Sequence, residues 1–496
     1  MGKKAELIID KNVPVSVIDE RIFSSFIEHL GRAVYGGIWD PNSPLSDSEG
    51  FRRDVLDLVR ELNVPMVRYP GGNFVSGYNW KDGIGPRENR PKRIDLAWRT
   101  IEPNLIGTDE FASWAKKANT SIMMAVNLGT GNMQNALDLL EYCNIESGTY
   151  YSDLRCKNAS KEPYNIKTWC LGNEMDGKWQ TGHKTPSEYA RTAAETARSM
   201  KMLDPSIELV ACGSSNSKMA TFPEWERIVL SECYDDVDYI SMHQYFGKTA
   251  NGTPEFLATN VEMENFINST IAAADYVKAH VRSKKTMMIS FDEYNVWYHA
   301  KGQDNELMKT LRLAPPLLED IYTHEDALVL ASMLLTILKH SDRIKIACLA
   351  QLVNVIAPIM VRNGKAFKQT IYYPYQQIAS LARKGVVLYP ILKSTKFSSP
   401  SFSDVNDVDT LCVYHEEKKE AVIFAVNKAN EALDLSITSS WNKVKPIAFS
   451  EMTSNLDDVN SENEMKVYPK ERGINDSLNF TLKPYSWNVI KLKVEE

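Results

Sequence analysis

The sequence predicts an α/β protein in which a (β/α)8 barrel precedes a β-sandwich. Three observations support this prediction. Between about residues 21 and 383, short apolar runs alternate with amphipathic helical periods. Polar residues follow each of the apolar runs directly. Beyond about residue 384, strand-like runs are separated by turn residues and no helical period lies between them.

Eight apolar runs are the predicted barrel strands, and they cover residues 23–29, 65–73, 121–129, 168–174, 208–215, 239–245, 287–293 and 346–354. The stretch 48–63 shows the helical pattern clearly, with Phe51, Val55, Leu58, Val59 and Leu62 on one stripe. Further helices are predicted at 108–119, 133–144, 186–203, 222–233, 263–283 and 325–340. Eight strands separated by helices fit a barrel, although a doubly wound sheet also accommodates alternating units.

The residues that end the strands favour the barrel. Strand interiors are apolar, whereas the ends carry Glu28, Gly72-Asn73, Asn127, Asn173-Glu174, Ser214-Ser215, His243-Gln244-Tyr245, Glu293 and Gln351. In a closed barrel all eight carboxyl ends meet on one face, where catalytic residues lie. A common site explains this pattern better than separate structural reasons for each end.

Strand-like runs after residue 384 predict a β-sandwich that comprises residues 385–496. Two short strands are predicted within residues 1–18, around a turn. They have no place in a barrel that covers residues 19–384, so we expect them to pair into the sandwich.

Composition excludes several functional classes. The net charge of −7 and the lack of clustered basic residues argue against nucleic-acid binding. The longest apolar stretch is too short to span a membrane, and the first residues lack the apolar segment of a signal peptide. Seven scattered cysteines without a CxxC pair indicate neither a metal site nor a disulfide framework. We therefore expect a cytoplasmic protein without a metal or cofactor.

Two carboxylates at strand ends suggest catalysis on a sugar. Glu174 follows a buried strand and Gly-Asn, and Glu293 ends a second apolar strand. A buried charge is expected only where it is paired or functional. Trp297 lies just beyond Glu293, and an indole ring suits the apolar face of a sugar. One carboxyl group protonates the leaving oxygen of a glycoside while the other attacks or activates water.

Other candidates are weaker. In the segment RYPGGNF, glycines permit close approach of a ligand, and Asn73 offers a donor and an acceptor to a hydroxyl group. His29 and His183 are candidate general bases, although a lone histidine is more often structural. HExxH, GxGxxG after a strand and the Walker A motif are not found.

Together, the segments SFIEHLGRAVYGGIWD, RYPGGNFVSGYNW, WCLGNEMDGKWQ, DYISMHQYFG, SFDEYNVWY and ACLAQLVNVIAPI resemble the intracellular α-L-arabinofuranosidases of glycoside hydrolase family 51. The resemblance covers nearly the whole chain. It implies a barrel with a C-terminal jelly-roll sandwich, a retaining mechanism without metal, and a cytosolic homo-oligomer, usually a hexamer. It also implies that Glu174 is the acid/base and Glu293 the nucleophile.

The resemblance further implies that Glu28, Asn73, Asn173, Tyr245 and Gln351 bind the sugar, and that Trp98 and Trp297 flank the leaving group. The expected activity is exo-acting release of terminal arabinofuranose from arabinan- or arabinoxylan-derived oligosaccharides. Two alternatives remain: a β-xylosidase or endoglucanase on the same scaffold, and a non-catalytic carbohydrate-binding protein. The presence of both glutamates counts against pure binding, which does not need an acid and a nucleophile.

Overall fold

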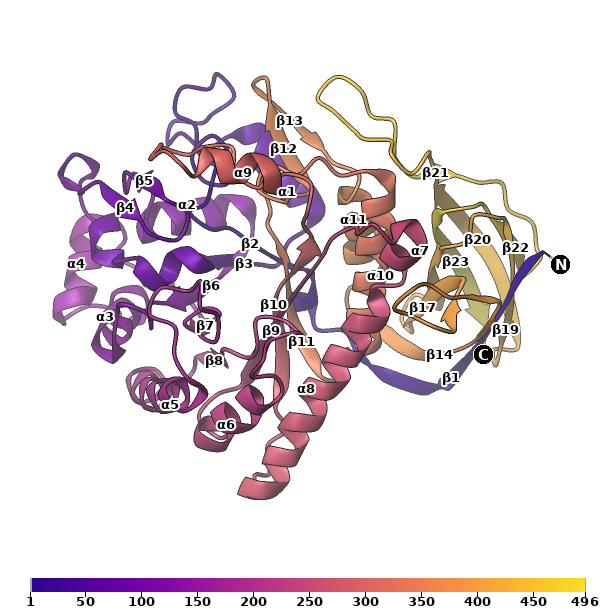
Figure 1. The fold of residues 1–496 in the computed structure, drawn as a ribbon, viewed down its shortest axis with the longest axis horizontal. Helices are drawn as coiled ribbons and strands as arrows, with labels where there is room; N and C mark the ends of the chain where they lie inside the picture. Colours follow the sequence, from indigo (N-terminus) through magenta and orange to yellow (C-terminus); the bar gives the residue numbers. More distant parts are fainter. Residues whose placement is uncertain (1, 496) are drawn as a thin grey trace.

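The computed structural model describes residues 2–495, and it contains a closed barrel of eight parallel strands (Figure 1). Around the barrel the strands follow the order β10-β11-β2-β3-β6-β7-β8-β9. The barrel closes because β11, its last strand in the sequence, pairs with β2, its first. Their bounds are β2 Ser24–Phe26, β3 Met66–Tyr69, β6 Ser121–Val126, β7 Thr168–Leu171, β8 Glu208–Ala211, β9 Tyr239–Phe246, β10 Met288–Val296 and β11 Ile344–Ala350. All eight predicted strands are confirmed.

Helices cover the outside of the barrel and connect its strands. They are α1 Arg53–Leu62, α2 Thr108–Ala118, α3 Met133–Asn144, α4 Tyr150–Asn158, α5 Pro186–Leu203, α6 Glu224–Cys233, α7 Gly252–Leu257, α8 Asn260–Val281, α9 Lys301–Leu307, α10 His324–Lys339 and α11 Tyr372–Ala382. The seven predicted helices are confirmed, whereas α4, α7, α9 and α11 were not predicted. Pro374 in α11 resembles a helix breaker, but it lies in the first turn, where proline is tolerated.

Short elements complete the barrel region. Four 3-10 helices span Glu20–Phe23, Asn73–Gly77, Trp80–Gly83 and Arg87–Asn89. Two small hairpins consist of β4 Arg93–Asp95 with β5 Thr100–Glu102, and of β12 Ile359–Arg362 with β13 Lys365–Lys368. Trp98 lies in the turn between β4 and β5, so this hairpin positions one of the predicted site residues.

A nine-stranded sheet forms the C-terminal part, to the right of the barrel in Figure 1. Its order is β21-β20-β23-β18-β17-β14-β1-β19-β22, with bounds β1 Lys3–Val17, β14 Val386–Ser394, β17 Val408–His415, β18 Glu420–Asn427, β19 Leu433–Ser439, β20 Lys443–Met452, β21 Lys470–Glu471, β22 Asn479–Leu482 and β23 Ser486–Glu495. Strands β15 Lys396–Phe397 and β16 Val405–Asn406 pair separately. Side chains from strands across the sheet share one core, which includes Leu7, Ile423 and Leu482.

The N-terminal segment enters this sheet, as expected, but as one strand and not two. Strand β1 runs between β14, which is antiparallel to it, and β19, which is parallel. The predicted turn is an irregularity within the strand, between Ile9 and Pro14. Asp10 accepts a hydrogen bond from the backbone N–H of Asn12 there, yet the chain does not reverse.

The barrel and the sheet pack closely against each other. Helix α10 is buried over most of its length, and it contacts barrel strands β10 and β11 as well as sheet strands β17, β18 and β23. Trp487 of β23 donates a hydrogen bond from Nε1 to Gln377 Oε1 of α11, at 2.7 Å. Within residues 2–495, no helix has the length and apolar character required to cross a bilayer.

Candidate active site

A cavity of about 560 Å³ opens at the carboxyl ends of the barrel strands. Eight of the nine predicted site residues line it, namely Glu28, Asn73, Trp98, Glu174, Tyr245, Glu293, Trp297 and Gln351. The ninth, Asn173, is buried beside the cavity, and its Nδ2 lies 3.5 Å from Asn73 Oδ1. Closure of the barrel thus brings together residues that are far apart in the sequence.

Glu174 follows the end of β7 in an unusual backbone conformation. Gly172 has a φ of 91° and Glu174 itself a φ of 44°, which is the left-handed region that non-glycine residues rarely adopt. The Glu174 carboxylate accepts a hydrogen bond from Trp179 Nε1 at 2.6 Å, and its other oxygen lies 2.9 Å from His243 Nδ1. Strain of this kind persists where surrounding contacts hold it, commonly at functional sites.

Glu293 lies within β10 and is more enclosed, with 7% of its side chain exposed. One oxygen accepts a hydrogen bond from Arg68 Nη1 at 2.8 Å. The other accepts from the hydroxyl group of Tyr245, also at 2.8 Å, and lies 3.5 Å from His243 Nδ1. These donors stabilise the charged form of the carboxylate.

The two carboxyl groups differ in their proton affinity. Burial raises the pKa of Glu174, and the negative charge of Glu293 raises it further against the opposing bonds from His243 and Trp179. Burial alone would also raise the pKa of Glu293, but the charges of His243 and Arg68 outweigh it and lower that pKa. One group is thus poised to hold a proton and the other to remain ionised, as acid and nucleophile must.

The pair is also close in space. One oxygen of Glu174, one oxygen of Glu293 and one ring nitrogen of His243 all lie within 4.8 Å of one another. Three such donors could hold a metal ion. However, His243 and Tyr245 already contact these carboxylates, and these contacts account for the spacing of the three groups.

Glu28 lines the same cavity and has polar partners of its own. One of its carboxylate oxygens accepts hydrogen bonds from the backbone N–H of Phe74 at 2.8 Å and from Trp98 Nε1 at 2.9 Å. Its own backbone N–H donates to Gln351 Oε1 at 3.0 Å. Gly72 is required here because a Cβ atom at that position would overlap the Glu28 carboxylate. Burial raises the pKa of Glu28 to about 8.

Sequence reasoning assigned no role to Arg68, His243 or Trp179, although all three lie inside the motifs that it used. Their contacts with the two glutamates depend on the barrel pairing and could not be read from spacing. His29 lies outside the cavity lining: its ring bonds Glu102 at 2.9 Å and the Tyr69 hydroxyl at 2.7 Å. His183 borders a separate surface groove, so neither candidate base reaches the carboxylates.

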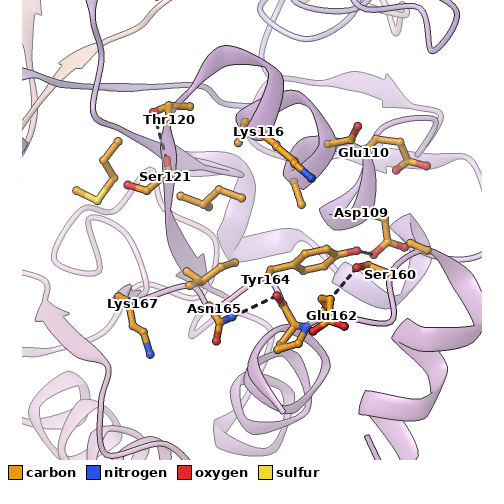
Figure 2. A pocket seen from close by; sticks show the side chains of 18 of the residues that line it. Asp109, Glu110, Lys116, Thr120, Ser121, Ser160, Glu162, Tyr164, Asn165 and Lys167 are labelled. Atoms are coloured by element: carbon orange, nitrogen blue, oxygen red, sulfur yellow. Dashed lines mark hydrogen bonds between the residues drawn. The ribbon is translucent and has the colours of Figure 1, made fainter. Parts of the chain in front are cut away.

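A groove of about 970 Å³ lies at the opposite end of the barrel (Figure 2). It is lined by Met66, Ser121, Thr168 and Glu208, which are the first residues of β3, β6, β7 and β8. Figure 2 shows Glu110 and Lys116 of α2 facing Glu162 and Asn165 across it. A catalytic site is not expected at this face, because the catalytic groups of such barrels gather at the carboxyl ends of the strands.

An eight-stranded barrel with a close pair of carboxylates and aromatic side chains at its carboxyl face defines a glycoside hydrolase of the two-carboxylate type. Comparison with known proteins specifies the family. Residues 58–285 match the model described as the α-L-arabinofuranosidase 1 domain, and residues 292–486 match the α-L-arabinofuranosidase C-terminal domain. The chain belongs to the family 51 α-L-arabinofuranosidases.

Several relatives match over nearly their whole length. The chain is 54% identical to an intracellular exo-α-(1→5)-L-arabinofuranosidase of Acetivibrio thermocellus, and the match covers 99% of both chains. It is 42% identical to an exo-α-(1→6)-L-arabinofuranosidase of Bifidobacterium longum, over 99% of this chain and 98% of the relative. Among solved structures, a family 51 α-L-arabinofuranosidase from Bifidobacterium longum superposes with a TM-score of 0.94 at 41% identity, covering 98% of this chain and 99% of that one.

Proposed function

We propose that this protein is a retaining, exo-acting α-L-arabinofuranosidase that releases terminal non-reducing arabinofuranose from arabinan- or arabinoxylan-derived oligosaccharides. The observation that carries the proposal is the pair Glu174 and Glu293, whose pKa values are shifted in opposite directions by burial and by their neighbours. Membership of the family and the names of close relatives support the substrate class.

The reaction has two displacements. Glu293 attacks the anomeric carbon and forms an ester bond, while the glycosidic C–O bond breaks and the leaving oxygen takes the proton of Glu174. Water then attacks the same carbon, gives a proton to Glu174, and the ester electrons return to Glu293. Carboxyl oxygens within 4.8 Å of each other fit this route better than inversion, which needs room for water between carboxylates about 6.5–9.5 Å apart.

The remaining predicted residues bind the substrate in this proposal. Glu28, Asn73, Asn173, Tyr245 and Gln351 contact the hydroxyl groups of the arabinofuranosyl unit, and Trp98 and Trp297 flank the leaving group. Support comes from their common location around one cavity. When a sugar that lacks a matching hydroxyl enters such a site, the buried polar groups are left without hydrogen-bond partners. The site therefore selects against that sugar.

The proposal includes a cytoplasmic location, homo-oligomeric assembly as a hexamer, and catalysis without a metal. Close relatives from Acetivibrio thermocellus and Bacillus subtilis bear names that describe them as intracellular, which supports the location. Inside a cell the substrates are short imported fragments. Sedimentation or light scattering tests the assembly, and activity that persists in a chelator tests the absence of a metal.

The stereochemistry of hydrolysis tests the central proposal. Early product, or the glycoside trapped with methanol, is expected to keep the α configuration when the reaction is followed by NMR. Inverted product would rule out Glu293 as the nucleophile. A panel of nitrophenyl glycosides separates arabinofuranosidase from xylosidase and glucanase activity. Defined (1→5)- and (1→6)-linked oligosaccharides establish the linkage, because relatives with both specificities match this chain.

A further inference from the structure

Another buried carboxylate, Asp292, lies behind the catalytic pair and outside the lining of the cavity. Its side chain is 2% exposed. One oxygen accepts a hydrogen bond from the hydroxyl group of Ser290. The other lies 3.9 Å from Arg68 Nε and 3.9 Å from Cys170 Sγ. Neither catalytic step uses this carboxylate directly.

Arg68 connects Asp292 to the site. Its guanidinium group donates from Nη1 to Glu293 at 2.8 Å and from Nη2 to Asn173 Oδ1 at 2.6 Å. The remaining N–H, on Nε, faces Asp292, and within residues 2–495 it has no hydrogen-bond partner. The guanidinium carbon lies 4.8 Å from the centre of the Phe26 ring, within reach of a cation–π contact. One buried cation is thus held between two carboxylates.

We propose that Asp292 is a positioning residue, which orients Arg68 and provides its counter-charge while Glu293 is bonded to the sugar. The inference rests on the proposed role of Glu293 as the nucleophile. A buried charge that loses its only partner is strongly unfavourable. The presence of a second carboxylate on the far side of Arg68 avoids that situation in the glycosyl-enzyme.

The charge balance changes at each step. When Glu293 forms its ester with the anomeric carbon, it becomes neutral, and the electrons of the broken glycosidic bond leave with the oxygen protonated by Glu174. Arg68, 1% exposed, then has Asp292 as its remaining carboxylate neighbour. His243, which lies on β9, faces Glu293 and Glu174. The thiols of Cys170, on β7, and Cys348, on β11, face Asp292.

Asp292→Asn tests the proposal with an aryl arabinofuranoside in rapid-quench and steady-state kinetics. Arg68 then pairs with Glu293 alone, so Glu293 becomes a poorer nucleophile and its pKa falls. We expect kcat/KM to decrease by roughly 10-fold to 100-fold, the usual effect of losing an outer partner of a site. The acidic limb of the kcat/KM profile should move to lower pH, and formation of the glycosyl-enzyme should slow more than its hydrolysis.

Asp409→Asn is the matched control. Asp409 is also a buried carboxylate paired with a cation, Lys428, at 3.0 Å, but it lies in β17 of the nine-stranded sheet. The Asp409→Asn substitution should lower the stability of the protein without moving the acidic limb of the kcat/KM profile. Ser290→Ala is a milder second variant, which retains the Asp292 carboxylate and should move the limb less, in the same direction as Asp292→Asn.

Wild-type kinetics in Asp292→Asn, or equal slowing of both steps without a shift of the limb, would overturn the proposal. If Asp292→Asn does not fold, Ser290→Ala decides, and an unmoved limb in that variant overturns it too. These outcomes are separate from failure of the proposed function, which appears in the wild-type enzyme as inverted product or as the absence of a trapped Glu293 ester.

Discussion

Glu174 and Glu293 illustrate how neighbours give two identical side chains different chemistry. Both are largely buried, and burial by itself raises the pKa of a carboxyl group. Both glutamates neighbour His243, but Glu293 also has the Arg68 guanidinium and the Tyr245 hydroxyl at 2.8 Å, whereas Glu174 has the indole N–H of Trp179. The difference in partners therefore decides which glutamate retains a proton.

Glu174→Ala is expected to affect poor leaving groups most. An alcohol needs protonation as it departs, and loss of a general acid costs about 10²–10⁴ in rate. An activated phenol leaves without that proton, so its kcat/KM should fall far less. Measured kcat/KM values for nitrophenyl and oligosaccharide substrates compare the two. Equal losses for both kinds of substrate would contradict the acid role.

Trp179→Phe is expected to move the alkaline limb of the kcat/KM profile to higher pH. The indole N–H bonds the Glu174 carboxylate at 2.6 Å and so lowers the pKa of that group. Without it the pKa of Glu174 rises, and a general acid stays protonated until a higher pH. Trp80→Phe is the control, because Trp80 Nε1 bonds the Asn135 carbonyl at 3.2 Å, outside the cavity. An unmoved limb in Trp179→Phe would show that this bond does not tune Glu174.

At the level of elements, helices hold the strand ends that carry the site. Tyr189 of α5 is fully buried, and its hydroxyl donates to the Leu171 carbonyl at the end of β7, at 2.7 Å. The same oxygen accepts from the backbone N–H of Cys212, just beyond β8, at 2.7 Å. Tyr189 thereby links the ends of β7 and β8 at Leu171, shortly before Glu174 in the sequence.

Tyr189→Phe should destabilise the protein and reduce activity together. The backbone N–H of Cys212 loses its hydroxyl partner, and the Leu171 carbonyl loses one donor but still accepts from Cys212 Sγ at 3.4 Å. An unsatisfied buried group costs about 1–3 kcal/mol. Chemical denaturation gives the change in unfolding free energy, and kcat/KM shows whether Glu174 is displaced. Tyr276→Phe provides the control, since Tyr276 on α8 is 60% exposed. Unchanged stability in Tyr189→Phe would mean that water replaces the hydroxyl group.

At the level of the whole molecule, the two ends of the sequence form one sheet. Strand β1 pairs with β14 and β19, which lie far away along the chain, as in the pairs Val17–Val386 and Lys3–Leu433. Leu7 and Ile9 of β1 are buried in the sheet core. The barrel thus lies between two segments that must meet before the C-terminal sheet is complete.

Leu7→Ala is expected to lower the unfolding free energy by about 2–5 kcal/mol, as for other buried leucines. The lost contacts lie in the sheet, so hydrogen exchange should increase first in β14 and β19. Val13→Ala, at a side chain that is 45% exposed on the same strand, should change stability little. Similar effects of the two substitutions would show that β1 contributes little to the sheet core.

Much of this architecture follows from local patterns in the sequence. Continuous apolar runs identified the eight barrel strands and the later strands, and a period of 3.6 residues identified seven helices, because burial imposes these patterns. Polar strand ends located the site. Helix α11, which carries Pro374 in its first turn, was not predicted, and β1 was divided at a turn signal that the strand absorbs as an irregularity.

By itself, the sequence determined the fold class and predicted the two glutamates and the residues around them. Tertiary structure decided what those residues do to one another. Arg68 lies 225 positions from Glu293 and His243 lies 69 from Glu174, so only closure of the barrel brings each donor to its carboxylate. A pKa depends on charges and burial in three dimensions, whereas a period in the sequence reports only which face of an element is buried.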